Sequence, residues 1–204
     1  MSETIATKQR ILGVAFRLFH EQGYNATSVA TILREAEVNS GSLYHFFPSK
    51  EALLTGVLEF ALDQLHPQVM GPAEKRSDEP IERIFQLLQQ YREGMQHFSC
   101  RMGCPIGNLA LEVADDFPEA RRLIDENFQN WKRYIRRWLD DAGERLPAHV
   151  DRNQLATLVL TIMEGGIMQS RAAGHLQPYD DSVAQLRAYF DALLKQSGIA
   201  GSAP

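Results

Sequence analysis

Two cysteines, Cys100 and Cys104, are the side chains of this sequence best suited to covalent chemistry, and Cys104 stands directly before a proline. Proline suits the first turn of a helix and pushes the preceding residue into the extended conformation of a helix cap. We therefore expect Cys104 to be the N-cap of a helix that begins at Pro105. Its sulfur would face unbonded backbone N–H groups, with Arg101 close by in the sequence. These groups favour the thiolate and predict a reactive cysteine; the alternative is a buried cysteine with a structural role.

The same segment suggests three other kinds of chemistry. A Cys100–Cys104 disulfide requires a turn that brings the two Cα atoms within about 7 Å. His97 and the two cysteines are metal-ligand types, but three ligands fall short of a closed four-coordinate site. A cysteine enzyme needs a histidine base nearby, and the chain has no nucleophile elbow, phosphate-binding glycine loop or paired-carboxylate signature. We therefore expect no enzymatic activity, no metal and no cofactor.

A second group of residues is suited to hydrogen bonding. Residues 26–48 contain two short helical patterns separated by a tight turn. Thr27 and Ser28 offer hydroxyls to cap the first helix, and Asn39 can cap the second; both helix starts present backbone N–H groups to phosphates. The outer face of the second helix is small and polar, which suits the major groove of DNA. It consists of Ser40, Gly41, Ser42, Tyr44 and His45.

These residues are expected to contact different parts of DNA. Ser40 and Ser42 lie where base edges would be, and Gly41 between them permits close approach without a side chain to read a base. Thr27 is expected to contact a phosphate in addition to capping its helix. Lys50 begins the following helix and is a candidate phosphate partner, with an unpaired surface lysine as the alternative.

The elements that position these residues are predicted to be helices almost throughout, so the expected fold class is all-α. The stretch from Pro67 to Pro80 is expected to be a loop, because Pro67 closes the helix before it. Gly143 is an expected helix stop, and residues 201–204 an unstructured tail. The expected helices are at about 5–21, 27–35, 39–45, 49–66, 80–98, 105–115, 118–142, 151–173 and 180–196.

The motif Val-Asn-Ser-Gly-Ser-Leu-Tyr-His-Phe-Phe-Pro-Ser-Lys-Glu-Ala-Leu at residues 38–53 closely resembles the N-terminal DNA-binding domain of the TetR family of bacterial transcriptional regulators. The resemblance implies a homodimeric repressor that a small inducer releases from a palindromic operator; activation in place of repression is the alternative. It places Tyr44 on the DNA backbone, and His45 is expected to contact a phosphate beside it. Glu37 departs from the glycine usual in the family's turn, so it must take a left-handed conformation or bend the turn differently.

The resemblance also implies a domain organisation. Residues 1–48 would form a three-helix helix-turn-helix domain, residues 49–66 a connecting helix, and residues 67–204 a larger ligand-binding and dimerisation domain. The segment 99–113, together with the turn at 36–38, is similar to the NemR-like electrophile-sensing branch of the family, in which a cysteine that matches Cys104 responds to electrophiles or oxidants.

The alternative regulator is a non-covalent apolar ligand, with Cys104 only lining its pocket. The residues expected to line such a pocket are aromatic or offer a polar handle. They are Tyr91, Asn108, Phe128, Trp131 and Met163.

The last two predicted helices, 151–173 and 180–196, have strong apolar faces that allow two interpretations. They either complete the core of one subunit or, as the resemblance implies, form a four-helix interface between two subunits. Gly165 and Gly166 would let helices approach closely in such an interface. A two-fold dimer would present two recognition helices to half-sites about one helical turn apart.

Composition is compatible with this interpretation. The chain has 204 residues, 44% of them hydrophobic, and a net charge of -5. It lacks an apolar run of the roughly 20 residues that span a bilayer, and its first residues do not resemble a signal peptide, so we expect a cytoplasmic protein without a membrane partner. Residues 1–50 carry five basic against four acidic side chains, too little positive charge for a protein that coats DNA regardless of sequence.

Overall fold

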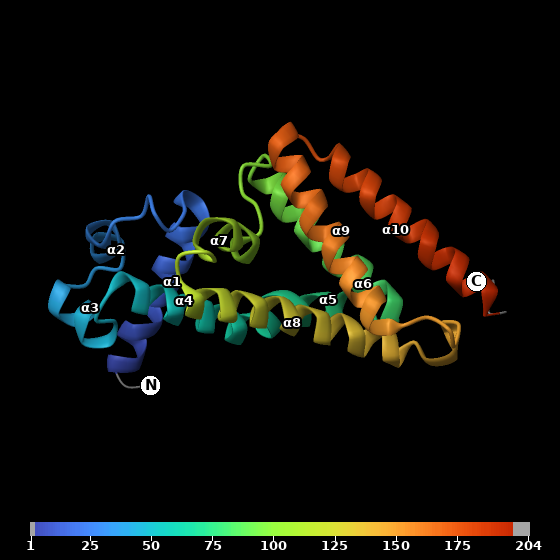
Figure 1. The fold of residues 1–204 in the computed structure, drawn as a ribbon, viewed down its shortest axis with the longest axis horizontal. Helices are drawn as coiled ribbons and strands as arrows, with labels where there is room; N and C mark the ends of the chain where they lie inside the picture. Colours follow the sequence, from blue (N-terminus) through green and yellow to red (C-terminus); the bar gives the residue numbers. More distant parts are fainter. Residues whose placement is uncertain (1–2, 198–204) are drawn as a thin grey trace. The chain divides into compact units, whose positions relative to one another are not determined.

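The computed structural model describes residues 3–197, and within that range it contains helices and no strand (Figure 1). The predicted tail at 201–204 lies outside the described residues. The all-α fold class is confirmed, and most predicted helices agree with the structure to within a few residues. The helices are α1 (Glu3–Gln22), α2 (Val29–Glu35), α3 (Ser40–Phe46), α4 (Lys50–Leu65), α5 (Gly71–Arg76), α6 (Pro80–His97), α7 (Pro105–Val113), α8 (Pro118–Asp141), α9 (Arg152–Ala173) and α10 (Gln177–Gln196).

The chain forms two compact units whose boundaries differ from the predicted domains. One unit contains the residues up to Gln64 together with Met102–Phe128, and the other contains Leu65–Arg101 and the residues from Gln129 onward. The predicted regulatory domain at 67–204 is therefore divided, because α7 and the first part of α8 belong with the helix-turn-helix. Asn127 of α8 shows the connection: its side-chain amide is buried and donates to the Leu58 carbonyl of α4 at 3.1 Å.

The core of the first unit receives more buried apolar side chains from α1 and from α4 than from any other helix of the unit. They include Ile11, Leu12, Ala15, Leu18, Phe19, Leu53, Leu54, Val57 and Leu58. Gly56 of α4 is a close-approach position, because a Cβ atom there would lie 2.7 Å from the ring of Phe47. The buried Phe47 follows α3, so this contact fixes the end of the helix-turn-helix against α4.

The second unit is built around α6, α9 and α10, and α9 packs along much of α10. Tyr179 lies in the first turn of α10 and is almost fully buried; its hydroxyl donates to the Leu88 carbonyl of α6 at 2.8 Å. Gly166 of α9 makes room for it, because a Cβ atom at this position would lie 2.9 Å from the Tyr179 ring. The left-handed Gly174 (φ 75°) ends α9 and lets the chain reverse into α10.

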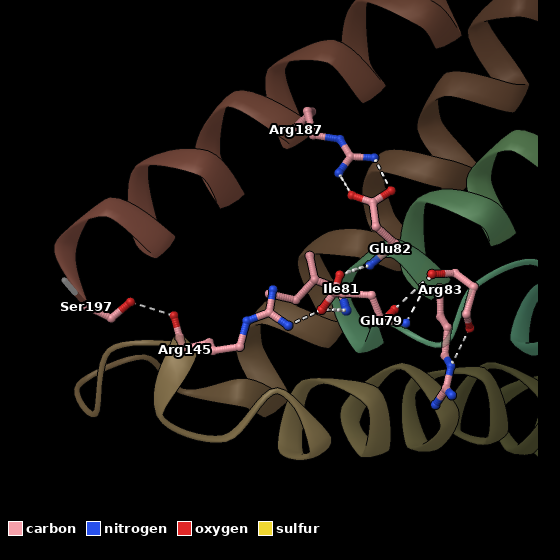
Figure 2. A network of polar contacts seen from close by, with 8 residues as sticks. Glu79, Ile81, Glu82, Arg83, Arg145, Arg187 and Ser197 are labelled. Atoms are coloured by element: carbon pink, nitrogen blue, oxygen red, sulfur yellow. Dashed lines mark hydrogen bonds and ion pairs between the residues drawn. The ribbon is translucent and has the colours of Figure 1, made fainter. Parts of the chain in front are cut away.

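A polar network joins the start of α6 to α10 and to a 3₁₀ turn at Gly143–Arg145 (Figure 2). Glu79 is the N-cap of α6 and also accepts a hydrogen bond from Arg145. Glu82 pairs with both terminal nitrogens of Arg187, and the Ser197 hydroxyl donates to the Arg145 carbonyl at 2.6 Å. Because these groups are partly exposed, each ion pair contributes only about 0–1 kcal/mol.

The loop predicted between Pro67 and Pro80 is wrong. A π-helix occupies His66–Met70 and α5 follows directly, so extended backbone begins only at Ser77. Because α4 runs directly into this π-helix, Pro67 stands within a continuous helical path, where its missing N–H group removes one backbone hydrogen bond. Met70 and Ala73 are fully buried, and their burial stabilises a helical backbone in this segment. The proline and glycine residues of the segment had predicted a loop instead.

Glu74 of α5 connects the same segment to α8. Its carboxylate accepts hydrogen bonds from Trp138 Nε1 at 3.0 Å and from Arg137, and His66 Nε2 lies 3.3 Å from its second oxygen. Burial raises the pKa of the Glu74 carboxyl, but the hydrogen bonds from Trp138 and His66 and the charge of Arg137 outweigh it and hold the pKa below its usual value.

Candidate nucleic-acid interface

The two short helices of the predicted helix-turn-helix are capped by side chains, and the joint between them is fixed. Ser28 Oγ accepts the Thr31 N–H at 3.1 Å, and Asn39 Oδ1 accepts the Ser42 N–H at 2.8 Å. Each bond satisfies an N–H group of a first helical turn that the helix itself leaves unbonded. The predicted capping roles of Ser28 and Asn39 are confirmed.

The turn after α2 is a Schellman motif, with paired hydrogen bonds from Val38 N–H to the Leu33 carbonyl (3.1 Å) and from Glu37 N–H to the Arg34 carbonyl (3.3 Å). Glu37 has φ 52°, so it takes the left-handed conformation that was one of its two predicted options. A residue with a Cβ atom is strained there by roughly 1–2 kcal/mol. The turn between α2 and α3 thus has the backbone geometry that glycine usually adopts, although the residue in it is Glu37.

The face of α3 that the sequence assigns to DNA is on the surface. Leu43 is fully buried and fastens the helix to the core, whereas Tyr44 and His45 are exposed. Gly41 is also exposed, and a Cβ atom there would be 3.3 Å from Asn39 Oδ1. The helix therefore presents a low, polar surface over Ser40–Ser42, with an aromatic phenol and an imidazole beside it.

The prediction that Thr27 caps α2 is wrong. Its side chain is completely buried, and its hydroxyl donates to the carbonyls of Gly23 (2.7 Å) and Leu18 (3.3 Å). Ser28, one residue later, carries out the capping. The Thr27 hydroxyl is therefore not available to a phosphate in this structure, and its role is to fix the end of α1.

Of the two predictions for Lys50, the unpaired surface lysine is wrong. Its ammonium donates to the Tyr24 carbonyl at 2.6 Å and lies 4.2 Å from the centre of the Tyr24 ring. Burial lowers the pKa of Lys50, and the nearby carboxylate of Glu112 opposes that shift in part. Lys50 thus joins the start of α4 to the residues that follow α1, and its contact with a phosphate stays a prediction.

The expected position of Cys104 is confirmed. Cys104 has the extended conformation of an N-cap (φ -70°, ψ 130°), and its sulfur accepts the Gly107 N–H at 3.4 Å. The thiol is only 2% exposed. Asn108, one turn into α7, folds back so closely that a Cβ atom on Gly103 would lie 2.6 Å from its side-chain oxygen. The cysteine is therefore positioned at the start of α7 beneath a covering of neighbouring residues.

Of the other residues predicted to line an inducer pocket, Tyr91, Trp131 and Met163 lie in the second unit and Phe128 lies in the first. Tyr91 and Trp131 meet edge to face, with ring centres 6.1 Å apart. An open groove of about 510 Å³ lies between α6 and α10, and Arg92 on its wall pairs with Asp180 at 2.7 Å. None of the predicted pocket residues lines this groove, so it is not the predicted inducer site.

Sequence reasoning missed Glu112, a residue of α7 whose carboxylate bonds to the turn between α1 and α2. No local signal marks it, because its partners are almost 90 residues earlier in the chain. Within residues 3–197 there is no cluster of histidine, cysteine or acidic side chains that could hold a metal. None of the helices in that range has the length and apolar character needed to cross a membrane.

Two protein-family models match the chain. The model for bacterial regulatory proteins of the tetR family matches residues 11–57. The model for the tetracyclin repressor-like C-terminal domain matches residues 80–195. The matched segments contain the helix-turn-helix at one end and most of the remaining helices at the other.

Individual relatives agree with the family models. The chain is 33% identical over 165 residues to the HTH-type transcriptional regulator YxaF of Bacillus subtilis, covering 80% of this chain and 84% of that protein. It is 26% identical to the HTH-type transcriptional repressor DhaR of Mycobacterium sp., covering 92% of each chain. The solved structure of reduced E. coli NemR is similar with a TM-score of 0.77 over 89% of this chain and 96% of that one; at 23% identity this likeness shows a shared fold.

Proposed function

This chain belongs to the TetR family of bacterial regulatory proteins, and from that premise we propose that it is a sequence-specific transcriptional repressor. It would bind a palindromic operator as a homodimer and leave it when a small molecule binds or reacts. The observation that carries this proposal is the helix α3: it is capped by Asn39, anchored by the buried Leu43 and the half-buried Phe46, and polar at its remaining positions. These are the requirements for a helix that enters the major groove.

In this proposal the contacts divide into two sets. Ser40 and Ser42 reach base edges, and Gly41 allows the backbone to approach them. Tyr44 and His45 bind phosphates, since both are exposed and carry hydrogen-bond donors. The N–H groups at the starts of α2 and α3 provide further phosphate contacts that need no positive charge.

The proposed dimer interface is the outer face of α9 and α10. Large apolar side chains are exposed on these helices: Leu158 and Met168 on α9, and Tyr189 on α10. The two adjacent glycines have different surroundings. Gly166 accommodates Tyr179 inside the subunit, whereas a Cβ atom on Gly165 would have nothing within 4 Å. An open glycine beside exposed apolar side chains supports close contact with a helix of a second copy.

For release from DNA, we propose a thiol-reactive inducer that acts at Cys104. The sulfur at the N-terminus of α7 is in a place that stabilises a thiolate. Addition of that thiolate to a quinone forms one sulfur–carbon bond, and the thiol proton passes to a ring oxygen, so no further oxidant is needed. The burial of the thiol favours the second candidate, an apolar ligand that binds without reaction.

Fluorescence anisotropy with DNA from upstream of the protein's own gene tests these proposals. Wild type, Cys104→Ser and the matched control Cys100→Ser are compared on this DNA and on a scrambled duplex, with and without a quinone. Serine is a good N-cap, so Cys104→Ser keeps the start of α7 intact.

We expect wild type and Cys100→Ser to bind the upstream DNA preferentially and to be released by the quinone, while Cys104→Ser stays bound. Release of all three proteins alike would refute Cys104 as the sensor and leave the non-covalent ligand. Equal binding to both duplexes would refute the sequence-specific repressor.

A further inference from the structure

Glu112 makes two charge-assisted hydrogen bonds to the backbone just beyond α1. Its Oε2 accepts the Tyr24 N–H at 2.8 Å, and its Oε1 accepts the Asn25 N–H at 2.7 Å. Successive N–H groups that converge on one anion form a nest, a strong backbone site for a carboxylate. We call this pair of bonds the Glu112 contact.

Gly23 is shaped to receive this carboxylate. Its φ of +89° belongs to the region that favours glycine, and a Cβ atom there would lie 3.0 Å from Glu112 Oε2. The absence of a side chain therefore allows both the turn and the approach of the acid.

Tyr24 is held from the other side by α4. Lys50 donates to the Tyr24 carbonyl, so one residue has its N–H group bound by α7 and its carbonyl bound by α4. The Tyr24 ring packs edge to face against Phe19 of α1, at 5.3 Å between centres, and against Phe117, at 5.6 Å. The turn is thus fixed by three segments at once, and α7 supplies the negative charge.

The other end of α7 also contacts α1. The His20 ring donates through Nε2 to the Gly103 carbonyl at 2.6 Å, directly before the Cys104 cap. Both ends of α7 are therefore bonded to the last turn of α1 or to the residues that follow it.

The segment bound by Glu112 leads directly into the helix-turn-helix. The buried Thr27 and the cap Ser28 follow Asn25 within three residues. From there α2 passes through the fixed turn at Glu37 to α3, so the position of the turn at Tyr24 determines the direction of the helices that meet DNA.

We propose that Glu112 is a positioning residue of the DNA-binding surface, and that α7 controls DNA affinity through the Glu112 contact. This inference rests on the proposed function as a DNA-binding regulator, and it names how that surface is regulated. A ligand or modification that displaces α7 withdraws the carboxylate, leaves two N–H groups without their acceptor, and loosens the entry to α2.

Three variants of the full-length protein test this inference. Glu112→Ala removes both hydrogen bonds, and Glu112→Gln keeps one carbonyl acceptor but no charge. Leu111→Ala is the matched control, because Leu111 is the preceding residue of the same helix and is 82% exposed. For each protein, hydrogen–deuterium exchange is measured at the amides of Tyr24 and Asn25, and affinity for upstream DNA is measured by anisotropy. Thermal unfolding shows whether overall stability has changed.

In Glu112→Ala we expect exchange at the two amides and the dissociation constant for DNA each to rise roughly tenfold or more, the effect of losing hydrogen bonds to a charged group. Glu112→Gln should lie between Glu112→Ala and wild type, and Leu111→Ala should match wild type. The glutamine variant keeps the test valid if the alanine variant fails to fold.

Unchanged exchange at Tyr24 and Asn25 in both Glu112 variants would overturn the contact itself. Faster exchange with unchanged DNA affinity would overturn the positioning role, since the contact would then be structural only. A wild-type protein that shows no preference for upstream DNA would instead overturn the proposed function, and the exchange comparison would still decide whether the contact exists.

Discussion

Replacing Glu37 with glycine should stabilise this protein, although most substitutions destabilise proteins. Glu37 has φ 52° at the position of a Schellman motif where glycine is commonest. Relief of left-handed strain is worth roughly 1–2 kcal/mol, and the greater freedom of glycine in the unfolded chain costs about 0.5–1 kcal/mol. Because the side chain is exposed, little else is lost. The free energy of unfolding should rise by about 0.5–1 kcal/mol.

Denaturant unfolding followed by circular dichroism measures this change. Ala30→Gly is the matched control, since Ala30 is exposed on α2 itself and has helical backbone. Glycine there should lower the free energy of unfolding by about 0.5–1 kcal/mol, the usual cost relative to alanine in a helix. The two glycine substitutions, seven residues apart, should therefore change the free energy of unfolding in opposite directions. A loss of stability in Glu37→Gly would refute the assignment of strain to this turn.

Three further predictions concern the stability of the folded protein. Asn39→Ala should lower stability by about 1 kcal/mol through loss of the α3 cap, and Asn39→Ser should restore most of it in the same unfolding assay. Gly166→Ala should lower stability by about 1–3 kcal/mol, because its Cβ atom would lie 2.9 Å from the Tyr179 ring, whereas Gly94→Ala in α6 has open space and should not. The lowered pKa of Glu74 contributes stability above the unfolded-state pKa that is lost as pH falls through the folded-state value. Between about pH 5 and 3, wild type should therefore lose more stability than Glu74→Gln; parallel pH dependence would show that Glu74 is not responsible.

Local chemistry was sufficient to predict the helices and several of their ends. Asn39 and Cys104 were identified as caps because a cap depends on the residue itself and on its immediate neighbours, which the sequence displays directly. The Thr27–Ser28 pair marks the limit of such reasoning. Both residues have hydroxyls in adjacent positions, and only the packing of α1 against the following turn decides which one is buried and which one caps α2.

Long-range contacts were not predictable from one sequence. The bond from Lys50 to Tyr24 joins residues 26 apart, and the bond from Glu112 to Tyr24 joins residues 88 apart. The helical path through Pro67 depends in the same way on burial of Met70 and Ala73, which no local rule reveals. The composition of the two compact units was not predictable for a related reason: residues 102–128 are distant in sequence from the N-terminal helices but fold together with them.

The short length of α7 relates the two proposed regulatory residues to each other. The helix has nine residues, so its ends are only about 13 Å apart and it spans about two and a half turns. A helix of this length moves as one body, since bending it would break several of its few backbone hydrogen bonds. Enlarging the Cys104 side chain at one end would therefore shift Glu112 at the other, in a unit that already includes α2 and α3. If both residues act through the same helix, a quinone should release wild type from DNA. Glu112→Ala already binds DNA more weakly, and the quinone should not weaken its binding further.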